Sequence, residues 1–173
     1  MNYREQLLRP LSKNYVDHLV QNIFQNPEDF KILYPLIFDK DLNVAWRAAW
    51  ACAKVSEKHP EWFAENQILE IMKFTISISH GGVHRGCLSI LSNLRFPNSI
   101  PVDFINSCFD WMISPKFPVS VQSLSMKILY SICQIEPELS IELKAYLENV
   151  DFENYSAGFN STRKNILRRL KFS

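Results

Sequence analysis

The sequence predicts an all-α protein in which helical hairpins stack into a right-handed superhelix. Three observations support this fold class. Four segments with apolar residues at helical spacing each begin at a proline, namely Pro27, Pro60, Pro101 and Pro137. A second helix is expected after each of these segments. Equivalent places in the four second helices are held by Arg47, Arg85, Ser123 and Lys164, which are 38, 38 and 41 residues apart. The chain of 173 residues contains only 4 glycines, which suits helices joined by short turns better than a series of β-hairpins.

A helix is expected over residues 12–25, ahead of the first hairpin. Ser12 is a suitable N-cap, and the apolar side chains of Tyr15, Leu19 and Ile23 fall on one face of this helix. Because an open end of a repeat stack exposes apolar surface, we expect this helix to cover that end.

The first hairpin, residues 27–58, has the clearest pattern. Asn26 and Pro27 form a helix start signal, and a polar turn at residues 39–43 separates the two helices. The second helix is apolar on two faces, as expected for a helix packed between neighbours. Trp46 and Trp50 alternate with alanines on one of these faces, which favours a position in the core.

Three more hairpins are expected at residues 60–96, 101–135 and 137–172. The second turns at His80-Gly81-Gly82, the third at Pro115–Pro118, and the fourth through the longer polar stretch 151–158. No low-complexity segment or linker interrupts the series, so we predict a single domain over residues 1–173.

Residues 34–53 resemble a HEAT repeat. Pro35 stands within the first helix, Asp39 or Asp41 in the turn, Val44 follows, and Ala48-Ala49 supplies the small residues of the second helix. Ala45 stands where an arginine is usual in the family, and Arg47 comes two places later. The resemblance implies an α-solenoid of the HEAT or armadillo type, in which second helices line the concave side and bind other macromolecules.

Charge is sorted between the helices of each hairpin. The first helices, taken as 27–39, 60–79, 101–114 and 137–150, contain eleven acidic residues and three lysines. The second helices, taken as 43–58, 82–96, 119–135 and 159–172, contain eleven basic residues and one acid, Glu57. If the second helices line the concave side, that side is positive and attracts anionic partners.

We therefore expect a non-catalytic scaffold that binds an acidic macromolecule, more readily a protein segment than nucleic acid. The predicted contact residues are Arg47, Lys54, Lys58, Arg85, Lys127, Lys164 and Arg168, with Trp46 and Trp50 as candidate aromatic contacts. Structural explanations stand beside this one. Helix dipoles favour acids at helix starts and bases at helix ends. Arg47 is also a candidate partner for Asp39 or Asp41, and the basic residues 163–171 for the acidic run 136–153.

The alternative function is nucleic-acid binding, because helical-repeat DNA glycosylases for alkylated purines resemble this architecture. Their basic concave face carries tryptophans and a catalytic aspartate, whereas the second helices here contain no aspartate. His80 and His84 have a spacing that suits Zn²⁺ on a continuous helix, but the intervening glycines favour a polar turn. Cys52, Cys87 and Cys133 lie among apolar residues, and no signal-peptide or membrane-spanning run occurs, so we expect a cytoplasmic protein with no cofactor and no metal.

Overall fold

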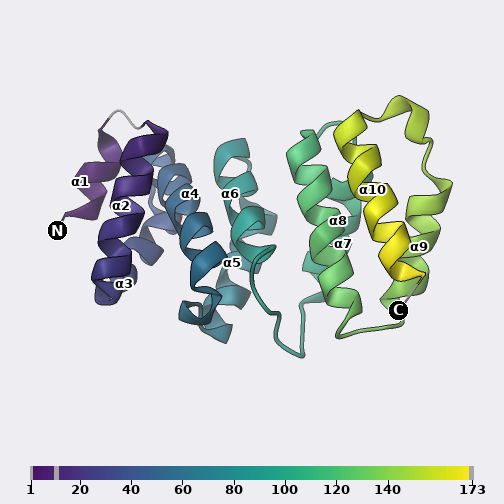
Figure 1. Ribbon diagram of the computed structural model, residues 1–173, viewed down its shortest axis with the longest axis horizontal. Coiled ribbons are helices and arrows are strands. Elements are labelled where there is room, and N and C mark those ends of the chain that lie inside the picture. The colour runs from purple at the N-terminus through teal and green to yellow at the C-terminus, as the bar shows by residue number, and fades with distance from the viewer. Residues whose placement is uncertain (1, 10–11, 172–173) are drawn as a thin grey trace. The chain divides into compact units, whose positions relative to one another are not determined.

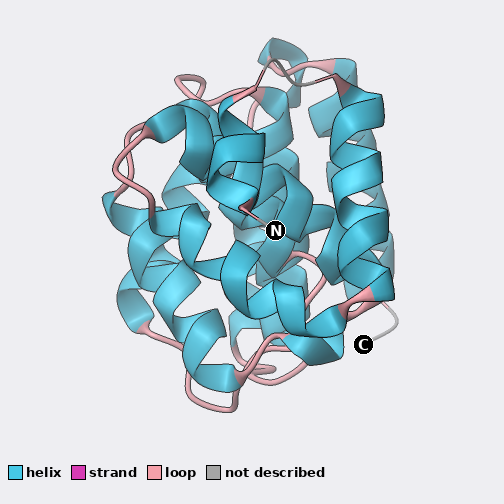
Figure 2. Cartoon of the chain, turned by 90° about the vertical axis from the view of Figure 1, so that its left-hand side faces the viewer, coloured by secondary structure: helices cyan, strands magenta, loops and turns pink. Residues whose placement is uncertain are grey.

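The computed structural model describes residues 2–9 and 12–171, and within these ranges it consists of helices, turns and loops without a strand (Figure 1, Figure 2). The all-α prediction is confirmed. The chain forms two compact units, residues 1–94 and 95–173. The single domain over residues 1–173 stays a prediction, and its last helix was expected to end at residue 172, which lies outside the described residues.

The first unit begins with two helices, α1 (Tyr3–Leu8) and α2 (Lys13–Gln25). Each has a side-chain N-cap: Asn2 accepts from the N–H of Glu5, and Ser12 accepts from the N–H of Tyr15. Helix α2 covers the segment expected from the sequence, whereas α1 was not predicted.

Proline shapes the first hairpin. It comprises the 3-10 turn η1 (Pro27–Asp29), α3 (Phe30–Leu33), the 3-10 turn η2 (Tyr34–Phe38) and the long helix α4 (Leu42–Lys58). Pro35 has no N–H to donate, so the α-helix that begins at Phe30 cannot continue unchanged and tightens into η2. Asp41 then caps α4 by accepting from the N–H of Asn43 at 2.9 Å.

The second hairpin comprises η3 (Pro60–Trp62), α5 (Glu65–Ser77) and α6 (Gly81–Leu91). Helix α6 packs along α4, and a Cβ at Gly86 would lie 2.7 Å from the Cβ of Ala49. Past the end of α6, the side-chain amide of Asn93 donates to the Ser56 hydroxyl at 3.0 Å. Both contacts join residues 37 positions apart, so α4 and α6 run parallel, side by side (Figure 1).

The second unit contains α7 (Val102–Ile113), α8 (Val119–Cys133), α9 (Leu139–Asn149), the 3-10 turn η4 (Phe152–Asn154) and α10 (Ala157–Leu170). The Thr162 hydroxyl donates to the Ser123 hydroxyl at 3.2 Å, and the Arg169 guanidinium lies 5.7 Å from the centre of the Tyr130 ring. Both pairs are 39 residues apart, so α8 and α10 are parallel neighbours too. In each unit the second helices thus pack against each other in register.

Each unit has its own apolar core. In the first, the buried side chains include Ile37, Val44, Cys52, Ile71 and Leu88, and in the second they include Phe104, Met112, Ile128, Leu143 and Phe159. All four cysteines are buried and free. Among the described residues, no helix is both long enough and apolar enough to cross a lipid bilayer.

Candidate partner-binding face

We define the second-helix face as the exposed polar and aromatic side chains of α4 and α6 in the first unit, and of α8 and α10 in the second. Seven basic residues on these helices were predicted to contact a partner. The structure places them in three different situations: bound to main-chain carbonyls, paired with a carboxylate, or exposed without a partner in the described chain.

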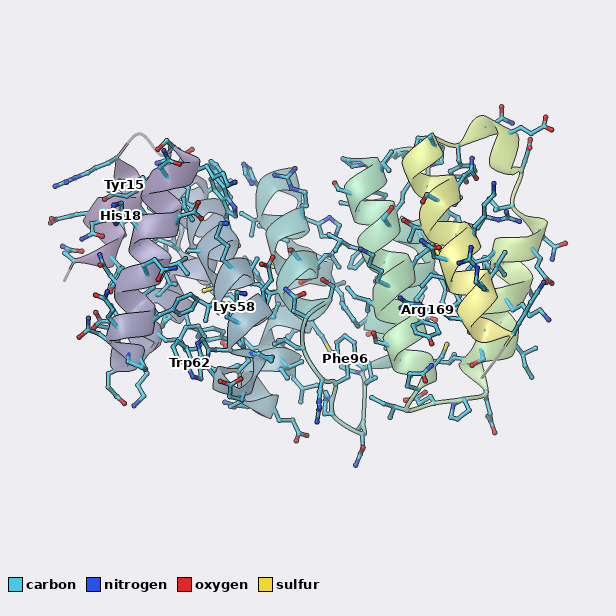
Figure 3. The ribbon with its side chains drawn as sticks, viewed as in Figure 1. Tyr15, His18, Lys58, Trp62, Phe96 and Arg169 are labelled. Atoms are coloured by element: carbon cyan, nitrogen blue, oxygen red, sulfur yellow. The ribbon has the colours of Figure 1, made fainter. Side chains whose placement is uncertain are left out.

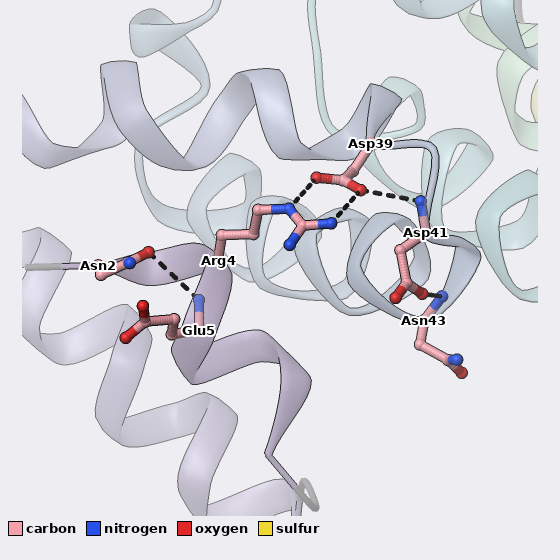
Figure 4. Close-up of polar contacts among 6 residues, drawn as sticks. All are labelled: Asn2, Arg4, Glu5, Asp39, Asp41 and Asn43. Carbon is pink, nitrogen blue, oxygen red and sulfur yellow. Dashed lines mark hydrogen bonds and ion pairs between the residues drawn. The ribbon is translucent and has the colours of Figure 1, made fainter.

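Arg47 on α4 binds the end of α1. Its guanidinium donates to the main-chain carbonyl of Leu7 at 2.6 Å and to that of Arg9 at 3.1 Å. Helix ends leave carbonyls without a partner, and cationic side chains satisfy them well. The suggested pairing of Arg47 with Asp39 or Asp41 is wrong. Asp39 pairs with Arg4 of α1 instead, and Asp41 caps α4 (Figure 4).

Lys54, two turns further along α4, pairs with Asp17 of α2 at 2.8 Å. The hydrogen bond from Lys54 lowers the pKa of the Asp17 carboxyl. Lys58 follows in the last turn of α4, where it is exposed and has no ion pair among the described residues (Figure 3). On α4, therefore, one of the three predicted basic residues is available to a partner without breaking a contact.

Trp46 and Trp50 were expected in the core, and that interpretation is wrong. Both are half-buried on α4. Their rings are stacked, with ring centres 6.0 Å apart and an angle of 11° between the ring planes. Their alanine neighbours Ala49 and Ala53 are buried as expected. At this place α6 presents two glycines to α4: a Cβ at Gly82 would lie 3.3 Å from the Cβ of Trp46, and one at Gly86 would lie 2.7 Å from the Cβ of Ala49. Arg85 on α6 is exposed and has no partner in the described chain.

In the second unit, Lys127 on α8 and Lys164 and Arg168 on α10 are all exposed. None of the three forms an ion pair with a described residue. Lys164 and Arg168 are one turn apart, within about 40° around the helix axis. Neither α8 nor α10 contains an acidic residue, so these cations are not neutralised by their own helices.

Sequence reasoning missed two features of the face. Arg169 lies over Tyr130 where α8 and α10 pack together, 39 residues apart, whereas the sequence pattern had matched Ser123 with Lys164, 41 residues apart. Arg163 donates to the main-chain carbonyl of Leu147 near the end of α9, so it serves this unit much as Arg47 serves the first. Of these contacts, only the one between Arg47 and the end of α1 could have been anticipated, because Asn2 and Glu5 form a start signal for α1.

The cysteines and two histidines near this face have structural surroundings. Burial raises the pKa of the Cys87 thiol to about 12 and raises the pKa values of the other three thiols as well, which makes them poor nucleophiles. His80 caps α6 by accepting from the N–H of Val83 at 3.2 Å, and His84 is buried. Within residues 2–9 and 12–171, no cluster of three His, Cys, Asp or Glu side chains has the geometry to hold a metal ion.

The comparisons with known proteins agree with this arrangement of helical hairpins, in which the second helices are parallel. The sequence profile of the HEAT repeat domain matches residues 3–170. The chain belongs to the HEAT repeat family. The fold of this HEAT repeat chain is similar to the crystal structure of an engineered protein, with a TM-score of 0.65 and 15% sequence identity. That match covers 92% of this chain and 70% of the engineered one, and at such identity it shows the fold alone. No curated protein sequence matches the chain.

Proposed function

We propose that this HEAT repeat chain is a non-catalytic binding module in which the second-helix face of each unit binds an acidic segment of a partner protein. The observation that carries the proposal is the charge of α8 and α10. Lys127, Lys164 and Arg168 are exposed there without ion pairs to described residues, and neither helix contains an acid. Lys58 and Arg85 add unpaired cations to the same kind of face in the first unit.

The opposite sign of the first helices supports the choice of an acidic partner. Exposed acids such as Glu65, Glu70, Asp103, Asp110 and Glu142 lie on α5, α7 and α9. An anionic segment is therefore attracted to the second helices and repelled by the first. A single exposed ion pair contributes only about 0.2–1 kcal/mol, so useful affinity requires several of these contacts at once. The field also raises the rate of capture, most strongly at low salt.

The seven predicted basic residues take different roles in this proposal. Lys58, Arg85, Lys127, Lys164 and Arg168 contact the partner directly. Lys54 contacts it only by leaving Asp17, and Arg47 acts by holding α1 against α4. We favour protein over nucleic acid because Arg47 and Lys54, the bases nearest the tryptophans along α4, already have partners in the fold.

A charge-reversal titration tests the proposal. The probe is a fluorescein-labelled peptide of alternating Glu and Ser residues, and its anisotropy reports binding to the full chain at low salt. The variant Lys127→Glu, Lys164→Glu, Arg168→Glu is expected to bind at least ten-fold more weakly than the parent. Its matched control, Lys31→Glu, Lys73→Glu, Lys144→Glu, changes three lysines of the first helices and has the same net charge.

The control separates a local face from total charge. Equal loss of affinity in both variants would show that net charge alone governs binding. No binding of the peptide by the parent chain would contradict the proposal directly. A single-stranded DNA of equal charge serves as the competitor. If it binds more tightly than the peptide, with a steep dependence on salt, nucleic acid is the better partner class.

A further inference from the structure

The stacked indoles of Trp46 and Trp50 form an aromatic surface that the fold leaves half-exposed. The interplanar angle of 11° means that the two rings are nearly parallel. The guanidinium carbon of Arg47 lies 5.5 Å from the centre of the Trp46 ring, and Arg47 is itself fixed by the carbonyls of Leu7 and Arg9. The indoles are therefore held in place before any partner arrives, which lowers the entropy cost of binding.

The indole N–H groups identify the chemistry of an occupant. A tryptophan N–H is a hydrogen-bond donor with no acceptor function, and it usually finds a partner when it is buried. Neither Trp46 nor Trp50 donates to a described residue, and both side chains reach solvent. A ligand that covers these rings must supply acceptors for the N–H groups. A purely apolar surface, such as the face of another helix, does not meet this requirement.

The charges around the pair argue against a nucleotide. An unstacked base would bring phosphates to α4, where Lys54 pairs with Asp17 and Arg47 is bound to carbonyls. Glu57, exposed about two turns after Trp50, would repel them. On the neighbouring helix α6, Gly82 lies against Trp46: a Cβ added at Gly82 would be 3.3 Å from the Cβ of Trp46. Arg85, one turn after Gly82, is the unpaired cation of that helix. Lys58, in the last turn of α4, is the other unpaired cation of this unit, and two separated cations suit single carboxylates that flank an uncharged segment.

We propose that Trp46 and Trp50 bind a proline-containing stretch of the acidic partner, in the polyproline II conformation. A polyproline II segment has no internal hydrogen bonds, so its carbonyls are free to accept from the indole N–H groups. Its pyrrolidine rings pack on aromatic surfaces, a mode that recurs in peptide recognition. Arg85 binds an acidic residue that flanks the prolines. This inference rests on the proposed function and adds the sequence character of the ligand.

Two synthetic peptides test the inference with the full chain. The first is Asp-Glu-Pro-Pro-Leu-Pro-Pro-Glu-Asp, and the second has alanine in place of each proline, so their charges are equal. The proline peptide is expected to bind the parent about five- to ten-fold more tightly. In Trp50→Ala this ratio is expected to fall to about one. In the matched control Trp62→Ala, which removes another half-buried indole of the same unit, the ratio is expected to persist.

A second measurement keeps the test independent of any variant's stability. In a ¹H–¹⁵N spectrum of the parent, the proline peptide is expected to shift the indole signals of Trp46 and Trp50 and to leave that of buried Trp111 in place. Unchanged Trp46 and Trp50 signals at saturation would overturn the inference. Equal affinity for both peptides, abolished by reversal of Lys127 and Arg168, would overturn it while leaving the proposed function intact. Failure of both peptides to bind would contradict both proposals.

Discussion

Arg47 of α4 donates to the carbonyl of Leu7 in α1 at 2.6 Å, across 40 positions of sequence. This bond makes Arg47 a structural residue of the first repeat. Its Nη1 donates to the carbonyls of Leu7 and Arg9, and its Nε is buried without a hydrogen-bond partner. One of the seven basic residues predicted to contact a partner therefore has its main contacts within the fold.

Arg47→Ala is expected to destabilise the protein by about 1–3 kcal/mol, because two carbonyls lose their donor. Urea unfolding measures this change, and hydrogen exchange at residues 3–8 locates it in α1. Arg47→Lys keeps the charge without the planar fork and should restore only part of the stability. Unchanged exchange in α1 after Arg47→Ala would show that the bond contributes nothing.

Two glycines of α6 give a matched pair for the packing of α4 against α6. A Cβ at Gly86 would lie 2.7 Å from the Cβ of Ala49, whereas a Cβ at Gly81 meets nothing within 4 Å. Gly86→Ala is therefore expected to cost about 1–3 kcal/mol through overpacking. Gly81→Ala is expected to be neutral within about 0.5 kcal/mol. The melting temperatures of both variants test this prediction. Equal stability of the two variants would show that the contact between α4 and α6 at Gly86 tolerates a methyl group.

The Arg4–Asp39 ion pair predicts a pH dependence. Arg4 lowers the pKa of the Asp39 carboxyl below its ordinary 3.8, chiefly through the hydrogen bond at 2.7 Å. A lowered pKa means that the folded state favours the ionised form. The stabilisation is therefore present above pH 3.8 and is lost as the pH falls through the lowered pKa. Arg4→Gln is expected to lower the free energy of unfolding at pH 7 and to have a smaller effect at pH 2, as measured by urea unfolding at each pH.

A control for this pH dependence is Lys31→Gln. It breaks an ion pair with Glu28 in which both side chains are largely exposed, 76% and 85%. Pairs of this kind contribute little, so no measurable change in stability is expected at either pH. A difference between Arg4→Gln and the parent that persists undiminished at pH 2 would show that Asp39 is not the group responsible.

The four cysteines are expected to resist thiol reagents in the folded protein. Each is buried, and burial raises the pKa of each thiol, to about 12 for Cys87. At pH 8 the native protein should react slowly with a colorimetric disulfide reagent. The urea-unfolded protein should react at once and release 4 equivalents of the coloured thiolate, one for each cysteine. Rapid reaction of one thiol in the native state would mean that its helix opens locally.

The sequence predicted the repeats well because their signals are local. Pro27 and Pro60 begin short turns ahead of α3 and α5, and Ser12 caps α2 as expected. The fold therefore follows from start signals and apolar spacing. Helix α1 was missed because it has only one turn and a half, although Asn2 and Glu5 form a start signal. That omission also caused the error about Arg47, since its acceptors lie at the end of α1.

The candidate face was harder to predict because exposure depends on the neighbouring helix. Trp46 and Trp50 have the apolar character of core residues, yet both are half-buried, and the neighbouring helix α6 presents glycines at this place. Likewise, the sequence could not assign Lys54 to Asp17, because that pair joins helices separated by a hairpin element. Charge sorting indicated which helices carry the basic residues, whereas the structure distinguishes the cations that have partners in the fold from the unpaired ones.

The most direct test of the proposed binding face is a chemical-shift map of the full chain with the Glu-Ser peptide. The perturbed amides are expected to lie on α4, α6, α8 and α10, with the largest shifts around Lys127 and Arg168. Shifts concentrated on α5, α7 and α9, or a uniform weak response across all helices, would contradict it.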